Sequence, residues 1–263
     1  MKRKALFFDI DGTLLSDHKK ELPESAARVI AQARRAGHLV FINSGRARCL
    51  MQEVEAALPV DVYLCGCGTY LEIQGKKVLH HVIGRERRLE LQKSILAHDL
   101  DGILEGPEGC AVQSQVSRLE EMERVKELFI KSGVVRPWDW KKEAAEFDKF
   151  CVLADEKSDV DGFLRSLAPD MAYIDRGRGL YECVPAGYDK ATAMEFILKY
   201  FRIPREESYA FGDSANDLAM IQYAGHSVIM GQHDRILEPY ASFITKNVED
   251  DGIAFAFEKL KIV

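Results

Sequence analysis

Short apolar strands that alternate with amphipathic helices constrain the fold of this chain most strongly. The pattern predicts a strand over Ala5–Phe8, a helix over Pro23–Ala36 and a strand over Leu39–Ile42. A helix over Arg46–Leu58 and a strand over Val60–Leu64 continue this order. Strands so short and so continuously apolar are typical of a parallel sheet that helices cover on both faces. We therefore expect an α/β fold with a Rossmann-like core.

The pattern changes to pairs of short strands between residues 84 and 185. Paired strands indicate antiparallel pairing, so we predict an inserted α+β cap over this range. The expected pairs are Gly102–Glu105 with Cys110–Gln113 and Met171–Asp175 with Leu180–Val184. The core then comprises residues 1–83 and 186–263. Its expected later elements are the helices Ala191–Tyr200 and Leu218–Ala224 and the strands Tyr209–Phe211 and Ser227–Met230.

Composition and hydropathy exclude two classes of partner. With 36 Lys+Arg, 42 Asp+Glu and a formal charge of −6, the chain lacks the basic face of a nucleic-acid binder. No apolar run approaches the roughly 20 residues that a membrane span needs. Asp9 and Asp11 also interrupt the N-terminal apolar stretch before a secretory signal could form. We therefore expect a cytoplasmic protein that binds neither nucleic acid nor membrane.

The six cysteines are scattered, which favours free thiols in a reducing compartment over a disulfide framework. Cys65 and Cys67 form the one close pair in the sequence. No second Cys/His pair stands at zinc spacing, so these two are expected to be small buried residues beside a strand end.

Two aspartates follow the first predicted strand, in Asp9-Ile-Asp11-Gly12-Thr13. Side chains two positions apart on an extended chain point the same way, so both carboxylates are expected at the carboxyl end of the strand, where parallel sheets bind ligands. Such a pair can hold a divalent metal or divide the roles of nucleophile and acid/base. An EF-hand loop is excluded because Gly12 and Lys20 occupy the fourth and twelfth positions from Asp9. A solvated acidic turn is the structural alternative.

A second acidic cluster, Gly212-Asp213-Ser-Ala-Asn216-Asp217, follows the predicted strand Tyr209–Phe211. By the same rule it lies at the carboxyl edge of the sheet, and Asp213 and Asp217 can both reach a cation held by the first loop. A helix N-cap explains one such residue but not the whole cluster. Paired acids at two separate strand ends therefore favour a functional site.

Two further elements suit a phosphate group. The second strand ends in Asn43-Ser44-Gly45-Arg46, where the Ser44 hydroxyl and the first amides of the next helix can form an anion site. Lys190, directly before the helix Ala191–Tyr200, is a candidate cation. Ser44 as a plain helix cap and Lys190 as a surface lysine are the structural alternatives. The absence of a Walker-type loop and of a complete G-x-G-x-x-G disfavours the binding of a nucleoside triphosphate or a dinucleotide.

Four motifs occur in order: Asp9-x-Asp11-Gly12-Thr13, Ser44-Gly45-Arg46, Gly187-Tyr-Asp-Lys190 and Gly212-Asp213-Ser-x-Asn216-Asp217. In that order they resemble the haloacid dehalogenase (HAD) superfamily of phosphohydrolases, in its Cof-type sugar-phosphatase-like branch, over the whole chain. Because 190 − 44 = 146 positions separate Ser44 from Lys190, the insertion falls where this branch carries its C2-type cap.

The resemblance implies catalytic and metal-binding roles. Asp9 would attack phosphorus and form an aspartyl-phosphate, and Asp11 would protonate the leaving alkoxide and then deprotonate the attacking water. Mg²⁺ would be held by the Asp9 carboxylate, the Asp11 backbone carbonyl and Asp213, with Asp217 close by.

The remaining motif residues are implied to surround the phosphate. Mg²⁺ and Lys190 would offset the repulsion between the Asp9 carboxylate and a phosphate dianion. The implied phosphate-binding residues are Ser44, Gly45, Arg46 and Asn216, together with Lys190.

Departures from the pattern of the branch bear on the substrate. Cys67-Gly68-Thr69 stands where an Asn-Gly pair is common, and Met230-Gly231-Gln232-His233 stands where an Asn-Ala pair is common. Both segments are implied to lie near the substrate end of the fold. In the cap, Arg176, Arg178 and Glu182 can reach a substrate hydroxyl or a second phosphate, with solvated hairpin residues as the alternative reading.

We therefore predict a Mg²⁺-dependent hydrolase of small phosphomonoesters, such as sugar phosphates. A phosphomutase of the same architecture is the nearest alternative. A non-catalytic phosphate sensor is the alternative from another class. Retention of Asp9, Asp11, Lys190 and Asp213 speaks against the sensor, because a binder needs no nucleophile and acid together.

Overall fold

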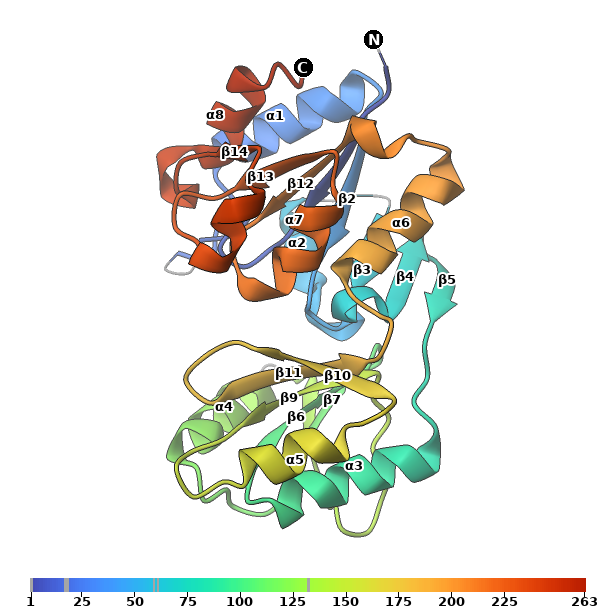
Figure 1. Ribbon diagram of the computed structural model, residues 1–263, viewed down its shortest axis with the longest axis vertical. Helices are drawn as coiled ribbons and strands as arrows, with labels where there is room; N and C mark the ends of the chain where they lie inside the picture. Colours follow the sequence, from blue (N-terminus) through green and yellow to red (C-terminus); the bar gives the residue numbers. More distant parts are fainter. Residues whose placement is uncertain (1, 17–18, 59, 61, 132) are drawn as a thin grey trace. The chain divides into compact units, whose positions relative to one another are not determined.

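The computed structural model describes residues 2–16, 19–58, 60, 62–131 and 133–263, and its chain divides into two compact units (Figure 1). The core unit comprises Met1–Gly45, Gln52–Val78 and Asp189–Val263. The inserted unit comprises Leu79–Tyr188 together with Arg46–Met51. These limits fall a few residues from the expected ones at 84 and 185. The structure also groups Arg46–Met51 with the inserted unit, whereas the sequence placed this segment in the core.

The core unit contains an eight-stranded sheet in the order β14-β13-β12-β1-β2-β3-β4-β5. Its strands are β1 (Ala5–Phe8), β2 (Leu39–Asn43), β3 (Val62–Cys65), β4 (Tyr70–Ile73), β5 (Lys76–His80), β12 (Ser208–Gly212), β13 (His226–Ile229) and β14 (Phe243–Ile244). β1 lies at the centre and runs parallel to both β2 and β12. The predicted strands correspond to β1, β2, β3, β12 and β13, except that position 61 of the predicted strand Val60–Leu64 lies outside the described residues. The sequence did not predict β4, β5 and β14, of which β4 is antiparallel to β3.

Helices cover both faces of this sheet. The neighbouring side chains Phe7 and Phe8 of β1, which point to opposite faces, show which helix covers which face. The ring of Phe8 stacks on Phe257 of α8 (Gly252–Lys259), whereas its neighbour Phe7 stacks on Phe41. Phe41 in turn contacts Phe201 of α6 (Lys190–Phe201). Because successive side chains of a strand point to opposite faces, α8 and α6 cover opposite faces. α1 (Glu24–Arg35) packs beside α8, and α7 (Leu218–Tyr223) packs beside α6 (Figure 1).

The predicted helix over Arg46–Leu58 is wrong in its first half. The structure has a short 3₁₀ helix at Arg48–Leu50 and then α2 (Gln52–Ala57). Ala47 adopts an extended conformation and packs, with Cys49, in an apolar cluster of the inserted unit. Tertiary burial of these two side chains therefore overrides the helical pattern.

The inserted unit contains a six-stranded sheet in the order β10-β11-β9-β6-β7-β8. Its strands are β6 (Asp101–Glu105), β7 (Cys110–Gln113), β8 (Val135–Trp138), β9 (Lys149–Leu153), β10 (Met171–Asp175) and β11 (Leu180–Pro185), and its helices are α3 (Arg85–Ala97), α4 (Glu120–Lys131) and α5 (Val160–Ser166). Both expected antiparallel pairs, β6 with β7 and β10 with β11, are confirmed. The α/β core with an inserted α+β unit is therefore the observed fold. Among the helices of the described residues, none combines the length and the apolar character that crossing a membrane requires.

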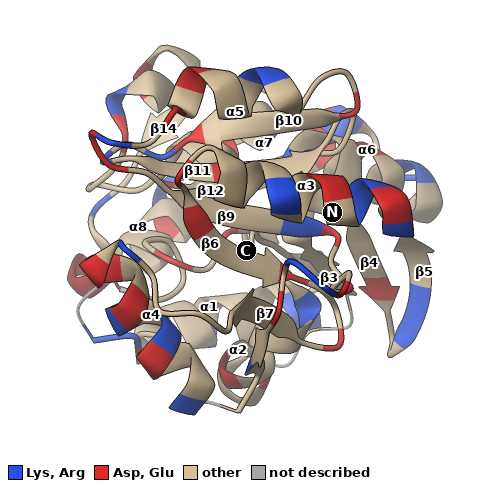
Figure 2. Cartoon of the chain, turned by 90° about the horizontal axis from the view of Figure 1, so that it is seen from below, with Lys and Arg blue, Asp and Glu red and all other residues tan. Residues whose placement is uncertain are grey.

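Charged residues of both signs occur along the helices and connections (Figure 2). Some charged residues are instead buried, and three of these, Glu105, Lys149 and Glu182, lie on strands of the inserted sheet. Lys149 Nζ lies 2.8 Å from Glu105 Oε1 and 3.2 Å from Glu182 Oε1. Arg176 Nη1 lies 3.1 Å from Glu182 Oε2. Glu182 is only 4% exposed. The alternative interpretation of Glu182 as a solvated hairpin residue is therefore wrong.

Replacing Lys149 with methionine is expected to lower the free energy of unfolding by about 3 kcal/mol, because Glu105 and Glu182 lose the buried cation between them. Urea denaturation followed by circular dichroism measures this change. Lys142→Met is the matched control, because it removes an exposed lysine paired with Asp139 and should leave the transition in place. Equal midpoints for the two variants would show that the buried pairs do not stabilise the fold.

Candidate active site

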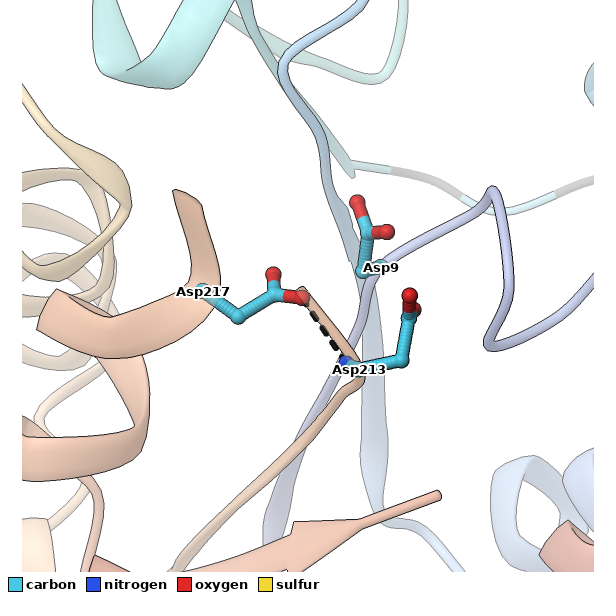
Figure 3. A group of neighbouring side chains, drawn as sticks. All are labelled: Asp9, Asp213 and Asp217. Atoms are coloured by element: carbon cyan, nitrogen blue, oxygen red, sulfur yellow. Dashed lines mark hydrogen bonds between the residues drawn. The ribbon is translucent and has the colours of Figure 1, made fainter. Parts of the chain in front are cut away.

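Three aspartates from two strand ends meet at the carboxyl edge of the core sheet (Figure 3). Asp9 directly follows β1, and its backbone N–H donates to the Phe211 carbonyl of β12 at 3.0 Å. Asp213 directly follows β12, and Asp217 lies one turn later, before α7. One carboxylate oxygen from each of the three lies within 4.8 Å of the others. The two acidic motifs of the sequence therefore converge, as predicted.

Lys190 is the cation of this cluster. It is the first residue of α6 and is fully buried, and its Nζ lies 2.6 Å from both Asp9 Oδ1 and Asp217 Oδ1. Asp189 caps the helix and forms a capping box with Thr192, which holds the preceding turn in place. Burial works against the charged lysine, but Asp217 and Asp9 together outweigh this effect and raise the pKa of Lys190 above its ordinary value. The lysine is therefore charged and is not a surface residue.

Asp217 organises the second acidic loop. Its Oδ2 accepts hydrogen bonds from the backbone N–H groups of Asp213 at 2.9 Å and of Ser214 at 3.0 Å, the first of which is drawn in Figure 3. Its Oδ1 accepts from Lys190. A Cβ atom at Gly212 would lie 2.7 Å from the Asp217 carboxyl carbon. The glycine of the motif is therefore needed so that the carboxylate can fold back against the strand end.

The first loop packs directly on Asp213. Thr13 Oγ1 donates to Asp213 Oδ1 at 2.6 Å. Gly12 has a φ of +84°, and a Cβ there would lie 2.4 Å from Asp213 Oδ2. Both the left-handed backbone and the close approach require glycine at this position. The Gly-Thr of the motif thus serves to bring the two strand ends together.

The Asp11 side chain differs from the expectation that it faces the same site as Asp9. It lies outside the group of three converging carboxylates, is 39% exposed and has its Oδ1 3.5 Å from Lys20 Nζ. β1 ends at Phe8, so the chain is no longer a strand when it reaches Asp11, and strand alternation does not apply. Asp11 is still close enough for its charge to contribute to the raised pKa of Asp9.

The expected phosphate-binding residues lie in separate segments of the chain, and one of them, Arg46, belongs to the inserted unit. Ser44 is buried directly after β2, where its backbone N–H donates to the Leu64 carbonyl at 2.8 Å. Gly45 is the last residue of the first of the three segments that form the core unit. Arg46 belongs to the inserted unit, and its Nη1 donates to the Leu50 carbonyl at 3.3 Å. Asn216 is buried in the second acidic loop, where its Oδ1 accepts from Ser214 Oγ.

Sequence reasoning missed two supporting residues. Asn43 is fully buried, and its Nδ2 donates to the Lys190 carbonyl at 2.9 Å. Asp234 Oδ2 accepts from the Ala215 N–H at 2.8 Å, and the Asp234 N–H donates to the Asp213 carbonyl. The position of Asn43 directly before Ser44, in a motif at a strand end, could have indicated a supporting role. Nothing in the sequence indicated a role for Asp234, because its partners Asp213 and Ala215 are distant in the chain.

Burial shapes the protonation of the carboxyl cluster. The pKa of Asp9 is raised chiefly by burial, which Lys190 partly offsets. The pKa of Asp213 is raised by burial and by the neighbouring charges of Asp217 and Asp9. With all groups ionised, three carboxylates and one lysine would carry −3 + 1 = −2. Oxygen donors with an excess of negative charge suit a hard divalent cation, so these residues fit a metal site.

Comparison with known proteins agrees with this fold. The family of haloacid dehalogenase-like hydrolases matches residues 6–257. YkrA of Bacillus subtilis is 29% identical over 272 aligned positions that cover 100% of both chains. Pyridoxal phosphate phosphatase YbhA of Escherichia coli is 24% identical and is matched over 97% of each chain. The structure of the HAD subclass IIB sugar phosphatase BT4131 superposes with a TM-score of 0.86 at 23% identity, over 99% of this chain and 100% of that one. The chain therefore belongs to the haloacid dehalogenase-like hydrolases.

Proposed function

We propose that this protein hydrolyses small phosphorylated metabolites, sugar phosphates among them, through an aspartyl-phosphate on Asp9. The observation that carries the proposal is the buried Asp9 carboxylate, bonded to Lys190 beside Asp213 at the carboxyl edge of the sheet. Similar proteins are named as phosphatases of pyridoxal phosphate and of 5-amino-6-(5-phospho-D-ribitylamino)uracil. These substrates share a phosphomonoester on a small, polar organic group.

Asp9 is the proposed nucleophile. Lys190 binds its Oδ1, which orients the carboxylate and leaves Oδ2 for attack on phosphorus. The P–O bond to the alcohol breaks as the new bond forms, and Asp11 gives a proton to the leaving oxygen. Asp11 then takes a proton from the water that hydrolyses the intermediate. The carboxylate that remains after the first step is the base that the second step needs.

We propose Asp9, Asp213 and the Asp11 backbone carbonyl as ligands of Mg²⁺. A divalent cation there supplies charge neutralisation, which lets a phosphate dianion approach a carboxylate. Asp217 has both oxygens engaged by Lys190 and by backbone N–H groups, so its proposed role is to hold these groups next to the metal. The proposed phosphate-binding residues are Ser44, Gly45, Arg46, Asn216 and Lys190.

Replacing Asp213 with asparagine is expected to raise the Mg²⁺ concentration for half-maximal activity at least about tenfold, because one anionic ligand is lost. Thr13 can still donate to the remaining oxygen, so the loop should stay in place. Activity measured over a Mg²⁺ series gives the result, with Asp250→Asn as an exposed control in the core unit. An unchanged Mg²⁺ requirement would remove Asp213 from the ligand set.

Mg²⁺ binding is expected to strengthen as pH rises from 6 to 8. The pKa values of Asp9 and Asp213 are raised above their ordinary range, so the metal-free protein holds protons that a cation must displace. Ionising these buried carboxyls costs stability as pH rises, and the cation offsets that cost. Calorimetric titration at constant ionic strength measures the affinity, and equal or tighter binding at pH 6 would contradict the assignment.

Phosphate release from a panel of phosphomonoesters tests the proposed function. The panel contains hexose, pentose and polyol phosphates and pyridoxal phosphate, each assayed with Mg²⁺ and with a chelator. Hydrolysis of at least one member that depends on Mg²⁺ is the expected result. Tight binding of a phosphorylated compound without turnover would support the sensor instead, and transfer of the phosphoryl group to a second sugar hydroxyl would support the mutase.

A further inference from the structure

The segment that follows Ser44 and Gly45 is packed within the inserted unit, although both of its ends continue into the core unit. Its Ala47 and Cys49 belong to one apolar cluster with β7 and α4. The other buried members of this cluster are Cys110, Val112, Leu119, Met122 and Val135. The attachment of the segment to the inserted unit therefore rests on non-covalent packing between apolar side chains.

Two thiols meet inside this cluster. Cys49 Sγ lies 3.6 Å from Cys110 Sγ, although the residues are 61 positions apart in the sequence. Cys49 is 9% exposed and Cys110 is 4% exposed, so Cys49 is the more accessible of the two. Sulfur atoms this close need only a small movement to reach bonding distance.

The hydrogen bond between the thiols makes them unequal. Contact between the two thiols lowers the pKa of Cys49 and raises the pKa of Cys110. A thiolate is the form that reacts with oxidants. Cys49, which is also the more accessible of the two, is therefore the attacking sulfur, and Cys110, 3.6 Å away, is placed to resolve the oxidised form.

We propose that Cys49 and Cys110 form a reversible disulfide when the protein meets a hydroperoxide. The Cys49 thiolate attacks the peroxide: the S–O bond forms, the O–O bond breaks and the peroxide is reduced to water or an alcohol. Cys110 then attacks the Cys49 sulfenic acid: the S–S bond forms, and the oxygen leaves as water with the thiol proton. In total two thiols lose two hydrogens for each hydroperoxide reduced, and a thiol reductant reverses the change by exchange.

The disulfide adds a covalent link between the segment after Ser44 and β7 of the inserted unit. It closes a loop that joins the core unit to the inserted unit, so it restricts motion of the segment relative to β7 and stabilises the folded chain. Resting on the proposed function, in which Ser44 and Gly45 contact phosphate, we expect oxidised protein to turn over more slowly. Reduction should restore the rate.

Peptide mapping after oxidation tests the disulfide itself, whatever the substrate is. The protein is treated with hydrogen peroxide, its remaining thiols are alkylated, and the digest is analysed by mass spectrometry. A peptide pair linked through Cys49 and Cys110, about 2 Da lighter than the two reduced peptides together, is the expected product. Absence of this pair after treatment with hydrogen peroxide would overturn the proposal.

Activity and stability then test the consequence. Oxidised wild type should lose at least about fivefold in kcat and gain several degrees in Tm, both reversed by dithiothreitol. Cys49→Ser and Cys110→Ala should keep their reduced-state activity after peroxide. Cys151→Ser, which removes the half-buried thiol of β9, should respond like wild type. Equal peroxide sensitivity of wild type and Cys49→Ser would overturn the link between the disulfide and turnover. If reduced wild type hydrolysed no substrate of the panel, that result would count against the proposed function alone.

Discussion

Replacing Asp9 with asparagine is expected to lower kcat by at least about 10⁴-fold, because the amide cannot attack phosphorus and no covalent intermediate can form. The fold should survive, since asparagine has nearly the same shape and its side-chain oxygen can still accept a hydrogen bond from Lys190. Initial rates of phosphate release at saturating Mg²⁺ and substrate measure the effect. Asp250→Asn makes the same chemical change at an exposed position of the core unit and should keep the wild-type rate.

Trapping of the intermediate separates a nucleophile from a metal ligand. Acid quenching of wild type during turnover should leave phosphate on the peptide that contains Asp9, and the Asn variant should show none. Since Asp9 is also a proposed Mg²⁺ ligand, a loss of rate alone does not distinguish the two roles. A variant that keeps its rate, or phosphate trapped on another residue, would contradict the assignment of Asp9.

Replacing Lys190 with methionine is expected to impair both stability and catalysis. The variant leaves Asp9 and Asp217 buried without their common cation, which should cost about 3–5 kcal/mol of unfolding free energy. It also removes the group that orients the nucleophile, so kcat should fall by at least about 10³-fold. Denaturant unfolding and phosphate release measure the two effects separately.

Lys199→Met is the matched control for this prediction. Lys199 lies on the same helix, α6, but is exposed and pairs with Glu195 on the surface. Exposed pairs of this kind contribute little, so neither the unfolding transition nor the rate should change. If the two lysine variants behaved alike, the buried position of Lys190 would have no special role.

The elements predicted correctly are those with a continuous local pattern. β1, β2 and β12 are short apolar runs, and their burial on both faces makes the sequence signal unambiguous. β8 and β9 were missed because their patterns are interrupted: Pro137 stands inside β8, and β9 begins with the buried charge of Lys149. That charge is compatible with a strand only because Glu105 and Glu182 lie on neighbouring strands.

Motif order predicted most of the candidate site. Asp9, Asp213, Asp217 and Lys190 were all identified from residues at the ends of elements, and the structure brings them together. The direction of Asp11 was predicted from strand alternation, which ends at Phe8. Asn43 was missed because its partner, the Lys190 carbonyl, is 147 positions away.

The sequence by itself determined the α/β core with an inserted unit, and it predicted the residue types of the candidate site, because strand and helix periodicity and motif spacing are local properties of the chain. Only the tertiary structure decided which groups pair. It buried Lys190 between Asp9 and Asp217, placed Gly12 against Asp213, and moved Arg46–Met51 into the inserted unit, where Cys49 meets Cys110. These contacts join residues far apart in the chain, so they depend on how whole elements pack, which no local pattern records.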